Sequence, residues 1–226
     1  GLPFDSISRA APLGTDYLGR DMLTRILYGA RYTVGVAAIA TVLACLAGTM
    51  LALAAATIGG WIDAGLSRLL DAMISLPSLL FALVVVAAVG STIPVLILIA
   101  AVIYLPGAYR TVRALAVDIA AMEFVKVARA RGEGSLYIMH TEILPNIILP
   151  VLTDFGLRFI YVVLLLSGLS FLGLGIQPPY ADWGSLVREN MEGLAYGAPA
   201  VIMPALAIAS LTIGVNLLID ALPKRG

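Results

Sequence analysis

Two residues of opposite charge, Asp154 and Arg158, interrupt an otherwise uncharged stretch of sequence at residues 146–169. They lie four positions apart with the acid first, which is the order that favours an ion pair on one face of a helix. If the stretch crosses a membrane, such charges are costly and usually face a bundle interior or a water-filled cavity. We therefore weigh two roles equally. The residues either contact the charged end of a solute in a translocation path or form a neutralised pair that only fixes helix packing.

The sequence is poor in residues that perform catalysis or bind metals. One cysteine, Cys45, excludes an intrachain disulfide, and with one histidine, His140, it excludes a zinc or redox cluster. A G-x-x-x-x-G-K-[ST] loop is missing, and lysine occurs only as Lys126 and Lys224, so this chain has no site for ATP hydrolysis. We expect no catalytic residue, no metal site and no cofactor in this chain.

The composition indicates an integral membrane protein. Hydrophobic residues make up 61% of the chain and charged residues 12%, against ~45–50% and ~25% in soluble proteins. The mean hydropathy is +1.00. So few charges cannot give a soluble fold of this size a polar surface, whereas bilayer hydrocarbon stabilises such a chain. The 14 basic and 14 acidic residues give a net charge of zero, which excludes a basic nucleic-acid-binding protein.

The apolar pattern predicts five membrane-spanning helices. A span needs ~20 mostly apolar residues, and the uncharged stretch of residues 72–109 is too long for one crossing. Residues 90–94 (GSTIP) divide it, because glycine and proline interrupt helices. Pro77 is expected to kink or end a helix. The predicted spans are residues 33–58, 66–89, 93–112, 146–169 and 198–219.

The basic residues predict which end of the bundle is cytoplasmic, since cytoplasmic loops are rich in lysine and arginine. Five of them lie on one side (Arg9, Arg20, Arg25, Arg31 and Arg188) and eight on the other (Arg68, Arg110, Arg113, Lys126, Arg129, Arg131, Lys224 and Arg225). This bias predicts a cytoplasmic loop at residues 113–143, an outer N-terminal segment at residues 1–32 and an outer loop at residues 171–197. Because an outer N-terminal segment needs an earlier span or a signal sequence, we expect a further span ahead of Gly1.

The cytoplasmic loop contains a predicted amphipathic helix at residues 119–131, with residues at helical spacing on one face (Met122, Val125 and Ala128 or Arg129). Gly132 and Gly134 end this helix, and a second helix is expected to begin near Ser135. Pro145 then lies in the first turn of the next span, where its missing N–H costs little. Such a loop is either a docking surface or a solvated connection, and the pattern alone favours neither. The outer loop is also expected to contain a helix, at residues 187–194.

Three ordered segments resemble signatures of binding-protein-dependent ABC importer permeases. Residues 123–132 followed by 143–146 resemble the EAA signature. Residues 13–21 (LGTDYLGRD) resemble the LGTDxLGRD segment of the dipeptide/oligopeptide/nickel permeases, and residues 170–184 (SFLGLGIQPPYADWG) resemble their SFLGLGxxPPxxxWG signature. Two positions depart from the pattern: Lys126-Val127 stands where the EAA core has Glu-Ala, and Glu142 where a hydrophobic residue is common. ATPase contacts are therefore assigned to the segment as a whole.

The resemblance implies an all-α polytopic membrane helix bundle with the type I ABC importer permease fold. Residues 1–226 would form a single transmembrane permease domain that contains five of an expected six spans. The chain would be a multi-pass subunit of the bacterial cytoplasmic (inner) membrane, similar to the second permease subunit of dipeptide transporters. It would form half of a translocation pathway for di- or oligopeptides, with nickel chelates, glutathione and opines as alternative cargoes.

The implied partners are a homologous second permease subunit, which would make a heterodimer, two ATPase subunits that bind ATP and Mg²⁺, an extracytoplasmic substrate-binding protein, and lipid. The outer loop would contact the binding protein. An amphipathic helix at residues 123–136 would dock into a groove of an ATPase. The implied coupling residues are Glu123, Val125, Ala128, Arg129, Gly132 and Leu136.

Two other classes compete with this hypothesis. A proton-coupled secondary transporter would use Asp154, and the absence of an inverted repeat of broken helices counts against it. An intramembrane enzyme would need a nucleophile–base pair or a metal-ligand cluster on a span, and the predicted spans contain neither. Uptake driven by a proton gradient without any ATPase would distinguish the secondary transporter from an ATP-driven importer.

Overall fold

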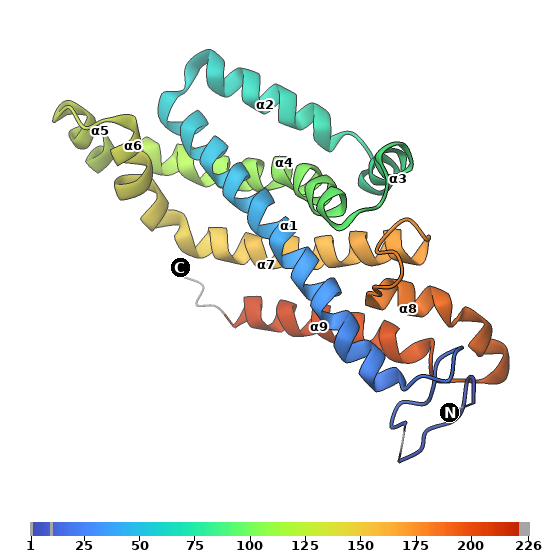
Figure 1. The fold of residues 1–226 in the computed structure, drawn as a ribbon. Helices are drawn as coiled ribbons and strands as arrows, with labels where there is room; N and C mark the ends of the chain where they lie inside the picture. Colours follow the sequence, from blue (N-terminus) through green and yellow to red (C-terminus); the bar gives the residue numbers. More distant parts are fainter. Residues whose placement is uncertain (1, 10, 222–226) are drawn as a thin grey trace.

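The structure, a computed structural model, describes residues 2–9 and 11–221 and shows a bundle of helices (Figure 1). Within those residues the only extended pairing is one isolated bridge between Thr15 and Asp21, so the predicted all-α class is confirmed. The elements in chain order are α1 (Met22–Ile58), α2 (Gly60–Ile74), α3 (Ser78–Val89), α4 (Ile93–Ala120), α5 (Glu123–Ala130), α6 (Ser135–Tyr137), the π-helical turn η1 (Ile138–Ile143), α7 (Leu144–Phe171), α8 (Trp183–Glu189), the 3₁₀ helix η2 (Met191–Tyr196) and α9 (Ile202–Asp220).

Four helices are long and apolar enough to cross a membrane: α1, α4, α7 with the helical residues before it, and α9. A fifth crossing is present if α2 and α3 together count as one broken span. The prediction of a single helix at residues 66–89 is therefore wrong, because α2 and α3 are bent by 85°. The break lies at Pro77, which has no N–H to donate and disfavours a helical conformation in the residue before it.

Several predicted boundaries differ from those of the structure. Helix α1 begins at Met22 instead of residue 33, because the Asp21 carboxylate accepts a hydrogen bond from the Thr24 N–H at 2.9 Å and caps the helix. The outer N-terminal segment at residues 1–32 therefore ends in helix. Helix α4 continues to Ala120 instead of residue 112, and α9 begins at Ile202 instead of residue 198. The turn predicted at residues 90–94 is confirmed, since α3 ends at Val89 and α4 begins at Ile93.

Two helices outside the spans that were predicted to be continuous are each divided in the structure. The predicted helix at residues 119–131 is divided by a turn at residues 121–122, between α4 and α5. The helix expected at residues 187–194 is divided at Asn190, between α8 and η2. By contrast, the helix that begins at Ser135 continues through η1 into α7 without a break. A continuous helical connection therefore joins the loop at residues 113–143 to the span that contains Asp154 and Arg158.

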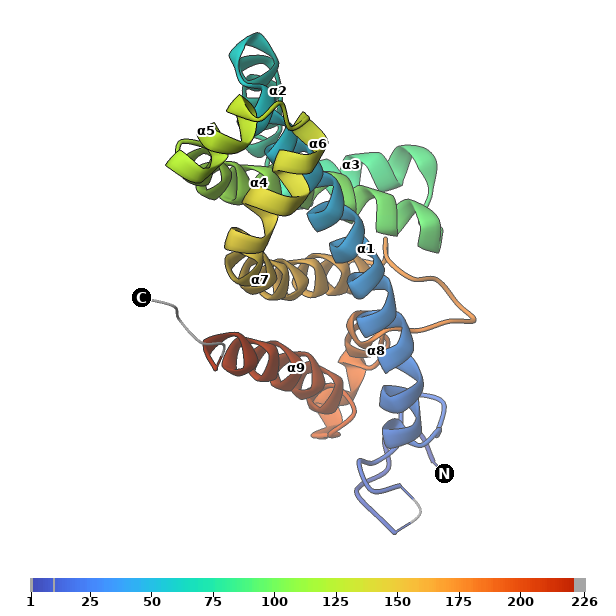
Figure 2. The same cartoon turned by 90° about the vertical axis from the view of Figure 1, so that its left-hand side faces the viewer.

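Small residues allow α1 to cross close to α4 and α7 (Figures 1 and 2). A Cβ atom added to Gly48 would lie 2.8 Å from the Ala108 Cβ and 2.9 Å from the Leu105 carbonyl oxygen, so the two backbones approach directly. Alanines of α1 are fully buried along the same contact (Ala37, Ala40, Ala44 and Ala52). This is the close packing of small residues that is typical of membrane helices.

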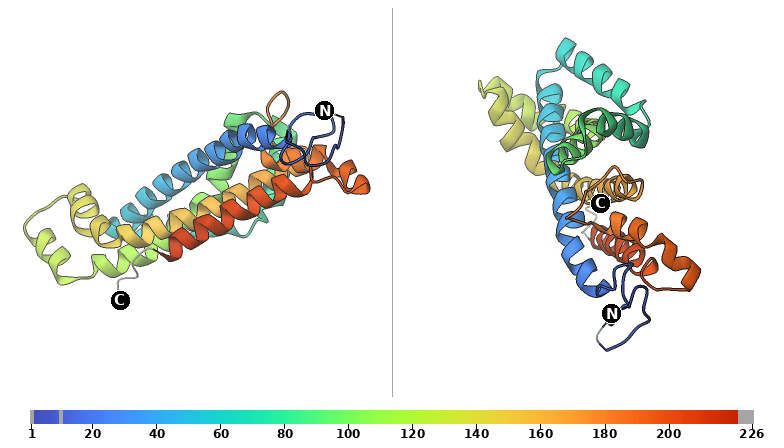
Figure 3. Two further views of the ribbon diagram at one scale, coloured as in Figure 1. Left: turned by 90° about the horizontal axis from the view of Figure 1, so that it is seen from below. Right: turned by 45° about the vertical axis from the view of Figure 1, so that its right-hand side comes forward.

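Different elements lie at the two ends of the bundle, as Figure 3 shows. The N-terminal segment lies with α8 at one end, and α5 and α6 lie at the other. The predicted outer and cytoplasmic segments are thus separated by the length of the bundle, although which end faces the cytoplasm stays a prediction. Lys224 and Arg225, predicted to be cytoplasmic, lie outside the described residues.

Candidate functional site

Asp154 and Arg158 form the ion pair that their spacing predicts. The Arg158 Nε donates to Asp154 Oδ2 at 2.6 Å, and Nη2 donates to Asp154 Oδ1 at 2.9 Å. Nη2 also lies 3.2 Å from the hydroxyl oxygen of Thr111, on the neighbouring helix α4. Each charged side chain is only 12% exposed. The pair therefore neutralises itself within α7 and fastens α7 to α4 at the same time.

Gly107 on α4 makes room for the Arg158 guanidinium. A Cβ atom at this position would overlap Nη1 of Arg158, so no larger residue fits unless the arginine moves. The Thr111 hydroxyl donates to the Gly107 carbonyl at 3.2 Å and accepts from Arg158, which holds this stretch of α4 against the arginine. The guanidinium is thus positioned by two helices.

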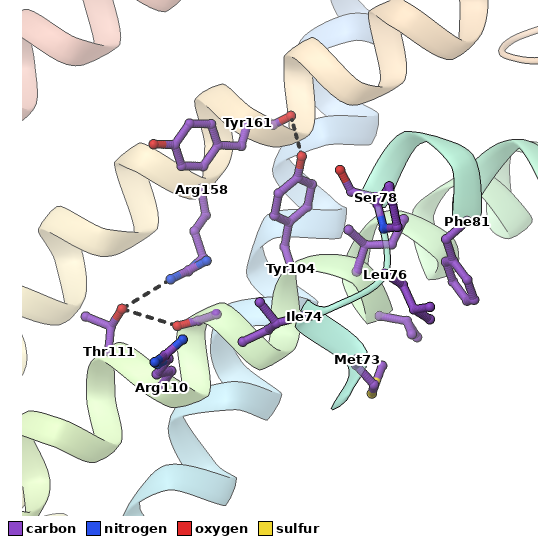
Figure 4. A pocket seen from close by; sticks show the side chains of 14 residues that line it. Met73, Ile74, Leu76, Ser78, Phe81, Tyr104, Arg110, Thr111, Arg158 and Tyr161 are labelled. Atoms are coloured by element: carbon purple, nitrogen blue, oxygen red, sulfur yellow. Dashed lines mark hydrogen bonds between the residues drawn. The ribbon is translucent and has the colours of Figure 1, made fainter. Parts of the chain in front are cut away.

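Arg158 lines a cavity of about 750 Å³ between the α2–α3 break, α4 and α7 (Figure 4). Its volume is typical of pockets for small ligands, roughly 300–1,000 Å³. The lining residues are Met73, Ile74, Leu76, Pro77, Ser78, Phe81, Val102, Ile103, Tyr104, Gly107, Arg110, Thr111, Arg158 and Tyr161. Asp154 is not among them, so the structure brings only one of the two predicted path residues to this cavity.

The tyrosines of the cavity connect α4 and α7 a second time. The Tyr104 hydroxyl donates to the Tyr161 carbonyl at 3.1 Å, and the two rings stack with centroids 6.3 Å apart. Neither these tyrosines nor Arg110 were predicted from the sequence to be part of a site. Their spacing on α4, with Tyr104, Gly107 and Thr111 on one helical face, is a signal that could have placed them together. An apolar wall with two guanidinium groups suits a ligand that is both apolar and charged.

The cavity wall formed by α2 is tied to α4 by polar contacts. Arg113 on α4 donates from Nη2 to Asp63 Oδ2 on α2 at 2.6 Å, and the Tyr109 and Ser67 hydroxyls lie 2.9 Å apart. Most of α2 is otherwise exposed, since Leu70 is its one buried residue. These contacts attach α2 to α4.

The predicted coupling residues divide into two groups in the structure. Val125 and Ala128 are buried, and Val125 belongs to the same hydrophobic cluster as Ile138 and Ile143 of η1. The periodicity correctly placed these two on one face, but that face contacts the rest of this chain. Met122, assigned to the same face, is 46% exposed, because it lies at the turn before α5.

Arg129 also bonds within the chain. Its Nη2 donates to the carbonyl oxygen of Thr57 at 2.9 Å, in the last turn of α1. A positive charge at the C-terminal end of a helix is favourable, because the unpaired carbonyls there are partly negative. Arg129 thus joins α5 to α1, which is a role that the sequence did not predict.

The remaining predicted coupling residues lie on the exposed face of residues 123–136, which we call the coupling segment. Glu123 and Gly132 are exposed, and Leu136, on the separate helix α6, is 69% exposed. The expectation of one helix at residues 123–136 is wrong, because a turn with Gly132 at φ +84° separates α5 from α6. Phe124 and Val127 were not identified, yet they are 40% and 53% exposed beside Glu123. Helical spacing could have found Val127, which lies four positions after Glu123 and therefore on the same face.

At the other end of the bundle, Asp16 forms the centre of a polar network. Its side chain is fully buried and accepts bonds from the backbone N–H groups of Leu18 and Arg20, at 2.9 and 2.8 Å. It also accepts from Arg20 Nε at 2.7 Å and lies 3.6 Å from Arg25 Nε. Arg25 in turn donates to Glu189 of α8 at 2.9 Å. The segment LGTDYLGRD therefore clamps the start of α1 to α8.

Asp182 caps α8 from a buried position. Its Oδ1 accepts from the Ser185 N–H at 3.0 Å, and the Ser185 hydroxyl accepts from the Asp182 N–H at 3.0 Å, which forms a capping box. Burial raises the pKa of the Asp182 carboxyl above its ordinary value, more than the Ser185 N–H lowers it. The carboxylate form is therefore costly at this position.

We expect Asp182→Ala to lower stability by about 1–2 kcal/mol, because the cap is lost, and Asp182→Asn to preserve the cap. The pKa of the Asp182 carboxyl is higher in the native state than in the unfolded state, so protonation of this group stabilises the fold. This contribution to the free energy of unfolding is fully present below an aspartate's ordinary pKa, ~3.9, and declines as the pH rises through the native pKa. The asparagine side chain cannot ionise, so thermal melts of the Asp182→Asn variant should lack this decline. An unchanged pH dependence would contradict the assignment.

Among the described residues, no group of three or more histidine, cysteine, aspartate or glutamate side chains could hold a metal ion. The candidate site is thus the cavity with its ion pair, and the coupling segment lies at one end of the bundle. The apolar lining of the cavity with its two arginines is suited to binding a small ligand.

Residues 44–225 match the family described as "Binding-protein-dependent transport system inner membrane component". The dipeptide transport system permease protein DppC of Alkalihalophilus pseudofirmus is 34% identical over 92% of this chain and 69% of its own length. The glutathione transport system permease protein GsiD of Pectobacterium atrosepticum is 32% identical over 95% of this chain and 71% of its own length. The peptide transport system permease protein SapC of Salmonella typhimurium is 38% identical over 94% and 72%.

Two solved structures share the fold. One is an inward-facing structure of the MetNI methionine ABC transporter, with a TM-score of 0.65, 14% identity, and coverage of 90% of this chain and 97% of that one. The other is an amino acid ABC transporter with histidines, with a TM-score of 0.59, 17% identity, and coverage of 88% and 91%. The helices of this chain are therefore arranged as in ABC importer permeases, which confirms the predicted fold.

Proposed function

Because this chain belongs to the family of binding-protein-dependent transport system inner membrane components, we propose that it forms one half of a pathway that carries short peptides across the bacterial inner membrane. As a member of that family, it is a multi-pass permease subunit of an ABC importer. The observation that supports the pathway is the cavity of about 750 Å³ lined by Arg158. A charge-bearing cavity of this kind inside a helix bundle is where a membrane protein admits a polar solute.

The proposed cargo follows from the relatives. Two of them are described as peptide or dipeptide transport permeases and a third as a glutathione transport permease. Peptides combine apolar side chains with charged ends, which matches the apolar wall and the arginines of the cavity. Nickel chelates and opines remain alternatives of the same family, and they would use the same cavity.

The proposed coupling surface is the exposed side of α5 and α6. Glu123, Phe124, Val127 and Leu136 are all exposed there, and an amphipathic helix that presents such a face can lie in a groove of a partner. The buried Val125 would fix the position of this face instead of contacting the ATPase. We propose that two ATPase subunits, with ATP and Mg²⁺, dock at this end, and that a second permease subunit completes the pathway.

At the opposite end, the surface formed by α8, η2 and the N-terminal segment is the proposed contact for a substrate-binding protein. The network of Asp16, Arg25 and Glu189 holds these elements together. The proposed domain organisation is a single permease domain with an outer segment at residues 1–32, a coupling loop at residues 113–143 and an outer loop at residues 171–197.

Reconstitution tests the proposal. Proteoliposomes that contain the complete importer should take up a radiolabelled dipeptide only when binding protein is present on one side and ATP with Mg²⁺ on the other. Omission of the ATPase subunits is the control and should abolish uptake. Uptake that needs only a proton gradient would contradict the proposal and support a secondary transporter.

Gly132 gives a second test, through the turn after α5. A valine there would be forced to φ +84°, at a cost of roughly 1–2 kcal/mol, although no atom lies within 4 Å of the added Cβ. We expect Gly132→Val to reduce ATP-driven uptake at least tenfold while the protein still inserts, because a small displacement of α5 and α6 separates the docking surface from its groove.

Gly132→Asn is the matched control, since asparagine tolerates a left-handed conformation better than valine does. It should retain most of the uptake. Equal loss in both variants would indicate that the side chain itself obstructs docking, and normal uptake by the valine variant would contradict the assignment of this segment.

A further inference from the structure

The cavity between α3, α4 and α7 contains two guanidinium groups whose donors are not all used within the chain. We propose that Arg110 and Arg158 form a subsite for the carboxylate of the cargo. For a peptide this is the C-terminal carboxylate, so the inference rests on the function proposed above and specifies it. Four observations support the subsite: the free donors of Arg158, the position of Arg110, the missing acidic groups and the gap at Gly107.

Arg158 has five N–H donors, and its contacts account for three of them. Nε and one hydrogen of Nη2 serve Asp154, and the second hydrogen of Nη2 serves Thr111. Within residues 2–9 and 11–221, Nη1 has no hydrogen-bond partner, yet it is not among the buried unpaired atoms. Its two hydrogens are therefore available to a ligand, although the charge of the side chain is already balanced by Asp154.

Arg110 supplies the charge that is not balanced. It is exposed, it lines the same cavity, and among the described residues it forms no ion pair. Figure 4 shows both arginines among the side chains that line the cavity, Arg110 from α4 and Arg158 from α7. Arginine is the side chain best suited to bind a carboxylate, because its planar donors match the two oxygens.

Among the residues that the structure describes, no acidic side chain lines the cavity to compete with a ligand. Its other titratable lining residues are the phenols of Tyr104 and Tyr161, and the Tyr104 hydroxyl already donates to a backbone carbonyl. The remaining wall is mostly apolar, with Met73, Ile74 and Phe81 as examples. The net positive charge of the lining favours the carboxylate end of a peptide, and the apolar wall favours its side chains.

Gly107 is a positioning residue for this subsite. Because a Cβ atom there would overlap Nη1 of Arg158, an alanine would push the two free donors out of place. The ion pair with Asp154 involves Nε and Nη2 and so could persist in that variant. A substitution at Gly107 therefore affects the Nη1 group of Arg158, which is free to bind a ligand, more than the Nε and Nη2 groups, which bind Asp154.

Protection of a single cysteine tests the subsite in the complete importer. Ser78 lines the cavity and is exposed, whereas the natural Cys45 is buried, so a maleimide should label Ser78→Cys selectively. The rate of labelling is measured without binding protein, against increasing trialanine or trialanine amide. We expect trialanine to protect the cysteine at a concentration about tenfold lower than the amide, as the loss of one charged hydrogen bond predicts.

Arg110→Gln, in the Ser78→Cys background, should raise the half-protecting concentration of trialanine about tenfold and leave that of the amide unchanged. Gly107→Ala should have the same direction of effect. Arg68→Gln is the matched control, because Arg68 is also an exposed arginine but does not line the cavity, and it should change neither value.

The outcomes separate the two proposals. Equal protection by the acid and the amide would overturn the carboxylate subsite and leave the peptide pathway intact. Protection by neither peptide, in a complex that shows ATP-driven peptide uptake, would also overturn the subsite. A complex that takes up no peptide under any condition would overturn the proposed function itself. A variant that weakens both ligands equally would assign Arg110 a structural role, contrary to the inference.

Discussion

Replacement of Asp154 by alanine is expected to destabilise the protein by about 3–5 kcal/mol. The change leaves the Arg158 guanidinium without its carboxylate in a position where its side chain is 12% exposed. An unpaired charge in a membrane bundle is costly whichever way the neighbouring helices adjust. Thermal unfolding in detergent, followed by the loss of helical signal, measures the effect. Arg158→Leu should be nearly as harmful, because it leaves the carboxylate unpaired instead.

The double variant Asp154→Leu/Arg158→Leu distinguishes the two roles of the pair. Removal of both charges should restore most of the stability, since an apolar pair of similar volume often replaces a buried ion pair at little cost. If Arg158 only fixes packing, uptake should recover together with stability. If Arg158 contacts the cargo, as the cavity lining suggests, uptake should stay low in a stable protein. If the double variant were as unstable as the single ones, the explanation that the two charges mainly balance each other would be wrong.

Asp16→Ala is expected to have the second large effect, about 3 kcal/mol, because it removes the acceptor of three hydrogen bonds from a fully buried position. Arg25, which has no hydrogen-bond partner for its buried Nε, would also lose the carboxylate that lies 3.6 Å away. The N-terminal segment should then release from α8. Limited proteolysis of the N-terminal segment beside α8, compared with thermal unfolding, would show where the stability is lost.

Asp118→Ala is the matched control for that experiment, because Asp118 is an exposed aspartate near the end of α4. It should change stability by no more than ~0.5 kcal/mol, as expected for surface positions. If Asp16→Ala were equally mild, the network would be a surface feature and not the clamp described here.

The membrane character and the ion pair could be predicted from the sequence because both depend on local information. Composition identifies the solvent, and the spacing of Asp154 and Arg158 on one helix is sufficient to bring them together. The resemblance of three short segments added the fold. These inferences did not require knowledge of how distant segments pack.

The cavity could not be predicted, because it depends on contacts between helices. Its lining combines the bend at Pro77 with the close approach of α4 to α7 at Gly107 and Arg158, which lie 51 positions apart in the chain. A proline in an apolar stretch is compatible with either a kink or a complete break. The sequence alone does not distinguish an 85° bend from a smaller one.

The coupling segment shows a different limit of prediction from sequence. The helical spacing of Val125 and Ala128 correctly predicted a shared face, but a pattern does not state what a face contacts. Arg129 was assigned to an ATPase contact because it lies in the segment that resembles the EAA signature. Its bond to Thr57, across 72 positions, became visible only once α1 and α5 were placed together.

The length and continuity of helix α1 have a mechanical consequence. Its 37 residues contain no proline, so it is a continuous rod ~55 Å long at 1.5 Å per residue. At one end the Trp183 indole of α8 donates to the Ile26 carbonyl, and at the other Arg129 donates to the Thr57 carbonyl. A helix that is continuous and hydrogen-bonded to other elements near both ends is expected to transmit a displacement along its length. When the end beside α5 is displaced, the clamp at α8 is displaced too, and no flexible loop lies between them to absorb the motion.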